Sequence, residues 1–137
     1  MTPRQIQCVI QSWQLVENDP VEFGQVFYTQ LFALAPAMRR LFPSNLDRQH
    51  TMLARAMNLV VAGLSSLDLL TPGLIDLGRR HATYGAKPED YAVFGKALIA
   101  TLEERSNGHL TPEMREAWED TFRLVSSIML NGVETIT

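Results

Sequence analysis

The 137-residue sequence contains one cysteine, Cys8, and a small formal net charge of −3. A single cysteine excludes an intramolecular disulfide. A reducing compartment is then the simpler expectation, and we expect a cytoplasmic protein. The small negative charge gives no electrostatic reason to expect nucleic acid or an anionic membrane as a partner. No continuous apolar run approaches the roughly 18 residues of a membrane span, and the N-terminal segment has no signal-peptide core.

Most familiar catalytic signatures are also missing from the sequence. It has no glycine-rich phosphate loop, no HExxH motif and no CxxC pair. The three histidines, His50, His81 and His109, lie too far apart to form a local zinc cluster. Acidic residues are plentiful, but they fall on polar helix faces, where we expect them to be solvated. His81 is therefore the strongest remaining candidate for a chemical role.

Helix-start signals recur along the whole chain, and strand signals do not. Proline follows a residue that begins a helix at Thr2-Pro3, Asp19-Pro20, Thr71-Pro72, Lys87-Pro88 and Thr111-Pro112. Threonine and aspartate cap orphan amides, and proline lacks an N–H where the helix would leave it unpaired. A further helix is expected from about Asp47 to Leu64, and a short one between Pro36 and Pro43. The sequence thus predicts an all-α protein of six longer helices and one or two short ones, forming a single domain over residues 1–137.

His81 lies on the apolar stripe of one of these predicted helices. Leu74, Leu77, His81 and Tyr84 are separated by steps of three, four and three residues, which places them on one helix face. A buried neutral imidazole has one donor nitrogen and one acceptor nitrogen, so it needs either two polar partners or a metal. Taken alone, this segment fits a hydrogen-bonded core histidine as well as a metal ligand.

The chain resembles the bacterial single-domain globins and the haem domain of flavohaemoglobins in four segments. These are the hexapeptide FYTQLF at 27–32, the tripeptide Leu41-Phe42-Pro43, the pair Arg80-His81 and the pentapeptide YAVFG at 91–95. Each motif alone is weak, but all four occur in the family order with near-family spacing. The resemblance runs from the first helix to Leu130. It implies a globin fold of six to seven helices around one haem b.

The resemblance implies that His81 is the proximal ligand of the haem iron. Such a ligand needs a neutral nitrogen directed at the metal, with the other ring N–H held by a carbonyl or a side chain. Leu77 matches the residue that packs beside this ligand, and Phe42 matches the aromatic residue that wedges the haem. Phe94 is expected to contact the haem, and Arg80 to pair with a haem propionate.

On the opposite, distal side the resemblance implies that Tyr28, Gln49 and Leu53 surround the bound gas. A phenol O–H and an amide N–H can donate to a gas ligand that carries partial negative charge, while leucine excludes water. A hydrogen bond to a charged group contributes about 1.5–3 kcal/mol, so we expect tight oxygen binding and slow release. His50 adjoins Gln49, but one residue turns a helix by about 100°, so His50 is expected to point elsewhere. A role for His50 as a sixth iron ligand is the minor alternative.

The resemblance predicts a protein that binds dioxygen, nitric oxide and carbon monoxide, for oxygen transport or for nitric oxide detoxification. The alternative is a nitric oxide dioxygenase, in which Tyr91 and a glutamate would be linked to His81. The family position of that glutamate falls on Val133, so whether Glu134 completes the network is left open. The sequence ends at Thr137 without flavin or nicotinamide domains, so turnover is expected to need an external reductase. A haem-based gas or redox sensor and a haem-free helical interaction module are the less favoured alternatives.

Overall fold

The structure is a computed structural model that describes residues 1–16 and 19–134. Over these ranges the chain forms six α-helices and two 3-10 helices, and no strand occurs in them. The elements are α1 (Pro3–Val16), α2 (Pro20–Leu34), η1 (Pro36–Leu41), α3 (Asp47–Gly63), η2 (Leu64–Ser66), α4 (Leu67–Thr83), α5 (Pro88–Arg105) and α6 (Pro112–Glu134). The predicted all-α class with six longer helices and two short ones is confirmed.

Polar side chains cap several helices where the sequence predicts a start. Thr2 and Gln5 form a reciprocal capping box, in which the Gln5 N–H donates to Thr2 Oγ1 at 3.1 Å and the Thr2 N–H donates to Gln5 Oε1 at 2.9 Å. Asp19 accepts from the Glu22 N–H at 3.1 Å at the start of α2. Each contact satisfies an amide that the first turn of a helix leaves unpaired.

The predicted start of the His81 helix at Thr71-Pro72 is wrong, because α4 already begins at Leu67. Pro72 lies inside the helix and removes one backbone hydrogen bond near its beginning. The hydroxyl of Thr71 donates to the Leu67 carbonyl at 2.8 Å instead of capping a new helix. Leu70 is buried in a cluster with Leu74 and Met129 of α6, so tertiary packing extends the helix beyond the local start signal.

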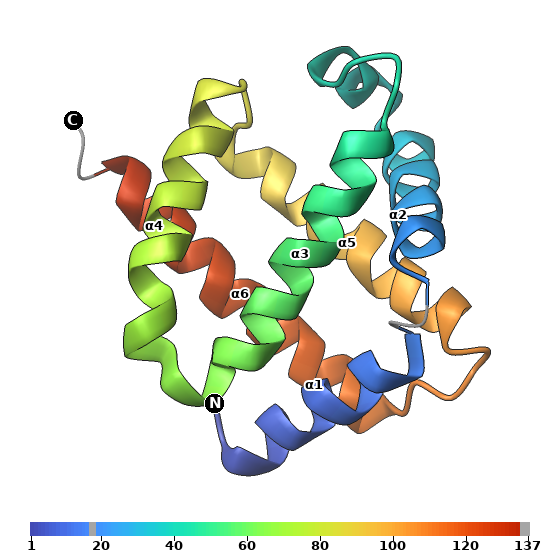
Figure 1. Ribbon diagram of the computed structural model, residues 1–137, viewed down its shortest axis with the longest axis vertical. Helices are drawn as coiled ribbons and strands as arrows, with labels where there is room; N and C mark the ends of the chain where they lie inside the picture. Colours follow the sequence, from blue (N-terminus) through green and yellow to red (C-terminus); the bar gives the residue numbers. More distant parts are fainter. Residues whose placement is uncertain (17–18, 135–137) are drawn as a thin grey trace.

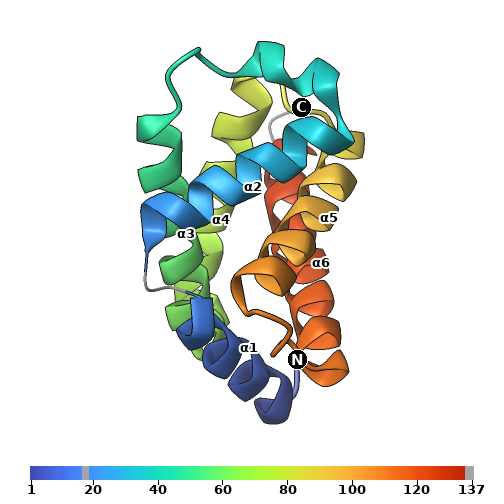
Figure 2. The ribbon, with the colours of Figure 1, turned by 90° about the vertical axis from the view of Figure 1, so that its right-hand side faces the viewer.

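The helices form two groups that meet along the interior of the molecule. On one side α2 crosses both α3 and α5, and on the other α4 packs along α6. Figure 1 shows α3 and α4 meeting at η2 and then diverging, and Figure 2 shows α5 and α6 running side by side. The largest core residues, among them Trp118, Phe23 and Phe27, belong to one large hydrophobic cluster. A smaller cluster lies between α4 and α6.

One stretch of the chain has the composition of a membrane span. The segment Asp47–Thr83 contains an 18-residue window with a mean hydropathy of 1.4. In the structure this segment is α3, η2 and α4, and the chain changes direction at η2 (Figure 1). No single straight helix therefore spans the segment. The expected absence of a membrane partner stays a prediction.

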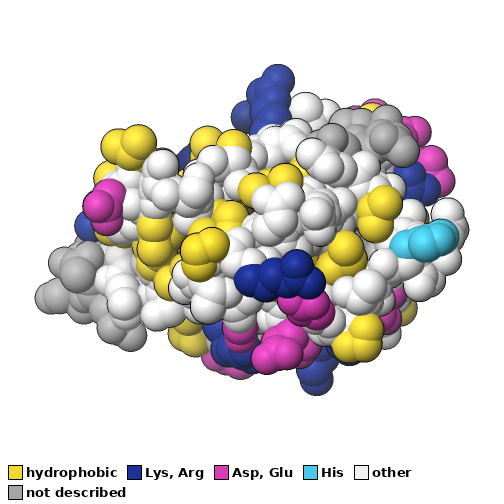
Figure 3. All heavy atoms as spheres, turned by 90° about the horizontal axis from the view of Figure 1, so that it is seen from below, with side chains coloured by type: hydrophobic (Ala, Val, Ile, Leu, Met, Phe, Trp, Pro, Cys, Tyr) yellow, Lys and Arg dark blue, Asp and Glu magenta, His cyan; other side chains and the backbone are white. Residues whose placement is uncertain are grey.

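The molecular surface mixes charges of both signs. In Figure 3, basic and acidic side chains alternate with hydrophobic ones over the face drawn. Ion pairs such as Arg4–Glu113 and Arg105–Glu22 join helices that are distant in sequence. Exposed pairs of this kind contribute little to stability. The face shown in Figure 3 carries no broad field of one sign of the type that attracts nucleic acid.

Candidate functional site

His81 is held in one orientation by its own helix. Its Nδ1 lies 2.8 Å from the carbonyl oxygen of Leu77, one turn earlier in α4. A carbonyl can only accept a hydrogen bond, so Nδ1 carries the proton and Nε2 is the basic nitrogen. Within residues 1–16 and 19–134, no group hydrogen-bonds to Nε2. The ring thus presents a neutral nitrogen whose protein partner is missing.

The electrostatics of His81 keep this imidazole neutral. Burial lowers the pKa of His81, the hydrogen bond to the Leu77 carbonyl acts in the opposite direction, and the neighbouring Arg80 charge lowers the pKa further. The net shift is downward, because desolvation disfavours the imidazolium. A neutral imidazole is the form that binds metals.

The backbone of α4 touches α6 beside His81. A Cβ atom at Gly78 would lie 2.2 Å from the carbonyl oxygen of Met129, so no larger residue fits without separating the helices. Leu77 and Tyr91 both pack against the cluster formed by Leu70, Leu74 and Met129. Tyr91 is half-buried, and burial raises its pKa. Two of the residues predicted for the proximal side, Leu77 and Tyr91, are therefore neighbours of one apolar cluster between α4 and α6.

Tyr28, the predicted distal tyrosine, lies in an aromatic cluster on α2. Its ring centroid is 5.0 Å from that of Phe27, 5.3 Å from Phe42 and 6.0 Å from Phe32. Burial raises the pKa of Tyr28 to about 12, so the phenol stays protonated at neutral pH. No residue in the described part of the chain hydrogen-bonds to its hydroxyl. Tyr28 is thus a buried residue whose hydroxyl donates to no described residue.

Two polar atoms in the first turn of α3 also have no hydrogen-bond partner among the described residues. Gln49 Oε1 and His50 Nδ1 are both buried, and neither has a hydrogen-bond partner. The sequence predicts Gln49 as the distal residue and His50 as pointing in another direction, and its prediction for Gln49 stays a prediction. The imidazole of His50 lies with its centroid 5.7 Å from the Tyr28 ring. The cause is the crossing of α2 and α3, which brings His50 against Gly24, where an added Cβ would lie 2.8 Å from His50 Cβ. Gly24, four residues before Tyr28, is the only sequence signal of this contact.

The remaining predicted site residues are Phe42, Leu53, Phe94 and Arg80. Phe42 ends η1 and contacts Tyr28 and Phe32 through its ring. Leu53 of α3 and Phe94 of α5 are partly buried and pack on the main core. Arg80 pairs with Asp76 at 3.2 Å, and their side chains are 52% and 68% exposed. The predicted contact of Arg80 with a propionate stays a prediction.

Glu134 and Val133, which the alternative function would involve, end α6. Their side chains lie outside what the structure describes. The chain also has an open hollow of about 370 Å³ between α5 and α6, lined in part by Gly95, Lys96 and Phe122. Neither His81 nor Tyr28 lines this hollow. Its mixed, charged rim shows none of the unpaired buried groups found around Tyr28, so we do not assign the function to it.

The comparisons with known proteins agree with the all-α fold. The family model Globin matches residues 25–129. Neuroglobin-1 of Oncorhynchus mykiss is 26% identical over 147 aligned residues, with 96% of this chain and 92% of that protein covered. Flavohemoprotein of Bacillus subtilis is 26% identical over 79% of this chain, which corresponds to 28% of that protein.

Solved structures give the same fold at lower sequence identity. A bacterial globin from Campylobacter jejuni superposes with a TM-score of 0.86 at 18% identity, with 98% of each chain covered. A hexacoordinated heme protein from an anhydrobiotic tardigrade superposes with a TM-score of 0.87 at 18% identity, with 96% of this chain and 94% of that chain covered. At this identity the likeness concerns the fold.

Proposed function

Since this chain belongs to the globin family, we propose that it holds a haem b and binds dioxygen and other diatomic gases, with slow release of oxygen. The family implies the haem, and the haem would supply the iron to which a gas binds. The geometry of His81 and of the polar residues near Tyr28 indicates whether this chain fits a haem. Two features of this chain bear on that fit, one on each side of the site.

The observation that carries the proposal is the hydrogen bond between His81 Nδ1 and the Leu77 carbonyl at 2.8 Å. A histidine ligand needs its other nitrogen held by an acceptor, which fixes both the tautomer and the direction of the ring. Here the acceptor is backbone within the same helix, and Nε2 is left free. A core histidine satisfied by the protein alone would have a partner on both nitrogens. His81 fits the ligand and does not fit the satisfied core residue.

The distal residues fit a small polar guest. A buried polar group without a partner costs about 1–3 kcal/mol, so several such groups in one region indicate a partner that the protein itself does not provide. Tyr28 can donate its O–H to a bound gas. Gln49 can do so through its amide NH₂, which a 180° rotation of the amide exchanges with Oε1. Phe42 and Leu53 supply the apolar walls that keep these hydrogen bonds strong.

The test is the visible absorption spectrum of the purified protein in ferric, dithionite-reduced and air-exposed reduced forms. We expect an intense Soret band, a five-coordinate ferrous spectrum and a persistent oxygenated form. A protein that shows no Soret band after haem is offered would contradict the proposal. A ferrous spectrum that is already six-coordinate without added gas would contradict an open gas site.

Nitric oxide dioxygenation is the second candidate, favoured by the position of Tyr91. This half-buried tyrosine packs on the same α4–α6 cluster as Leu77, the residue that holds His81. Such a position could influence the electron density of the proximal ligand. An external reductase would be required as a partner. Conversion of nitric oxide to nitrate over many cycles would support an enzyme, and a single stoichiometric burst would support a binding protein.

A further inference from the structure

His50 lies at the point where α2 and α3 come into contact. A Cβ at Gly24 would be 2.8 Å from His50 Cβ, 2.9 Å from His50 Cα and 3.0 Å from His50 Cδ2. The missing side chain at position 24 therefore allows the imidazole to lie directly on the backbone of α2. His50 cannot be displaced outward unless the first turn of α3 moves with it. Its position is set by the fold.

The imidazole is buried but not satisfied. His50 is 7% exposed, and its Nδ1 is buried without a hydrogen-bond partner. A neutral imidazole has one N–H to donate and one nitrogen to accept. Leaving such a group unpaired in the interior costs free energy, and an apolar residue of the same size would avoid that cost. The chain therefore carries a polar group at this crossing that packing alone does not require.

The side chain of Tyr28 lies against His50. Tyr28 follows Gly24 by one helical turn and so lies on the same face of α2. The centroids of the two rings are 5.7 Å apart and the planes are inclined by 38°. No hydrogen bond joins them in the structure, and the Tyr28 hydroxyl has no other partner among the described residues. Two unsatisfied groups, each able to donate and to accept, thus lie in contact.

We propose that His50 is a positioning residue for Tyr28: its N–H donates to the phenol oxygen, and the phenol proton is thereby directed at the bound gas. This inference rests on the proposed function, because it needs a gas beside Tyr28. The arrangement gives the imidazole N–H an acceptor and the phenol oxygen a donor. A hydroxyl that accepts one hydrogen bond also becomes a better donor for the next, since hydrogen bonds in a chain polarise one another.

The geometry favours this role over direct ligation of iron by His50. The Cδ2 edge of the ring faces the backbone of α2 at Gly24, and Nε2 is bonded to Cδ2. The Cδ2 side of the ring is thus packed on α2, the helix that also carries Tyr28. His81, by contrast, has its Nδ1 held by the Leu77 carbonyl, and no described residue hydrogen-bonds to its Nε2.

The experiment compares His50→Leu and His50→Gln in two backgrounds, the unchanged protein and Tyr28→Phe, all loaded with haem. The readouts are the C–O stretching frequency of the carbon monoxide complex and the rate of oxygen release. In the unchanged protein, His50→Leu should raise the C–O stretching frequency. It should also speed oxygen release roughly two- to tenfold, which is the effect of one neutral hydrogen bond. His50→Gln should give a smaller change, because an amide N–H can replace the imidazole donor. In the Tyr28→Phe background neither substitution should change either readout.

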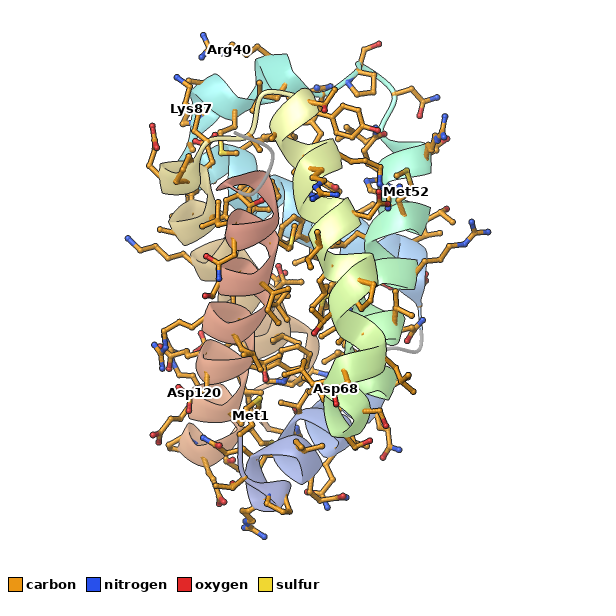
Figure 4. All side chains as sticks on the ribbon, turned by 90° about the vertical axis from the view of Figure 1, so that its left-hand side faces the viewer. Met1, Arg40, Met52, Asp68, Lys87 and Asp120 are labelled. Atoms are coloured by element: carbon orange, nitrogen blue, oxygen red, sulfur yellow. The ribbon has the colours of Figure 1, made fainter. Side chains whose placement is uncertain are left out.

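The outcomes separate this inference from the proposed function. Equal shifts in both backgrounds would show that His50 acts only through packing and would overturn the inference. A six-coordinate ferrous spectrum that becomes five-coordinate in His50→Leu would also overturn it, because His50 would then bind the iron itself. Absence of a Soret band in the unchanged protein would overturn the proposed function first. Met52→Leu is the matched control, since Met52 lies two residues along α3 with 39% exposure (Figure 4), and it should change neither readout.

Discussion

The Nδ1 of His81 hydrogen-bonds to the carbonyl of Leu77, and this contact makes one nitrogen of a half-buried ring available to a ligand. The contact spans one turn of a single helix, so it forms as α4 forms and needs no partner from another element. By contrast, the groups on the other side come from different helices. Tyr28 belongs to α2, Gln49 and His50 to α3, and only tertiary packing brings them together.

Replacement of His81 by alanine should abolish stable haem capture. The substitution removes the only imidazole that leaves α4 with a free, neutral nitrogen. His109→Ala is a well-matched control, because His109 Nδ1 also lies 2.8 Å from a carbonyl, that of Ser106, but on an exposed turn. Titration with haem followed at the Soret band measures both variants. Retention of tight haem binding by His81→Ala would show that the proximal assignment is wrong.

Replacement of Tyr28 by phenylalanine should speed oxygen release. Tyr28 is a buried, protonated residue whose hydroxyl bonds to no described residue, so its loss removes a donor to the gas without breaking a hydrogen bond among those residues. Release should accelerate by several-fold to about a hundredfold, since a hydrogen bond to a charged acceptor contributes about 1.5–3 kcal/mol. Stopped-flow displacement of oxygen by carbon monoxide gives the rate. Tyr84→Phe, at a tyrosine that is 63% exposed, should leave the rate unchanged. An unaltered rate in Tyr28→Phe would refute the distal assignment.

Two glycines should respond to alanine in opposite directions. Gly24→Ala places a Cβ 2.8 Å from His50 Cβ, so α2 and α3 must separate, and we expect a loss of about 1–3 kcal/mol in the free energy of unfolding. Gly73 lies in α4 with nothing within 4 Å of its Cβ position. There Gly73→Ala should stabilise the protein by about 0.4–1 kcal/mol, because the unfolded chain loses freedom. Denaturant unfolding of both variants measures the difference. Equal effects at the two positions would show that the α2–α3 contact is looser than described.

The sequence predicted those features that depend on neighbouring residues. Proline after a capping residue marked the starts of α1, α2 and α6, and the spacing of Leu74, Leu77 and His81 placed the imidazole on the apolar face of α4. The same local logic failed at Thr71-Pro72, because burial of Leu70 against α6 extends the helix toward its N-terminus. A capping signal competes with tertiary packing, and only the fold decides which of them prevails.

The candidate site also combines features that local sequence predicts with features that only tertiary packing produces. A one-residue step along α3 correctly separates the directions of Gln49 and His50, but it says nothing about which helix lies on the other side. The crossing at Gly24 is a contact between helices that are separated by η1 in the chain, and no local pattern encodes its position. Figure 4 illustrates a further case: Arg40 and Lys87 lie at one end of the molecule although they come from η1 and from the residue before α5. Charge clusters of this kind become visible only after folding.

Removal of the haem should destabilise the protein strongly. A haem covers several hundred Å² of apolar surface, which corresponds to a gross contribution on the order of 10 kcal/mol at about 25 cal/mol per Å². Without it, Gln49 and His50 keep their unpaired polar atoms while the aromatic cluster around Tyr28 loses its cover. Helix α3, whose first turn carries two of these residues, should therefore loosen first. Thermal unfolding of the haem-free and haem-loaded protein should show a large fall in Tm on haem removal, and amide hydrogen exchange should show faster exchange in α3 than in α6. Equal Tm values for the two forms would mean that the core closes without the haem, and the proposed site would have to be abandoned.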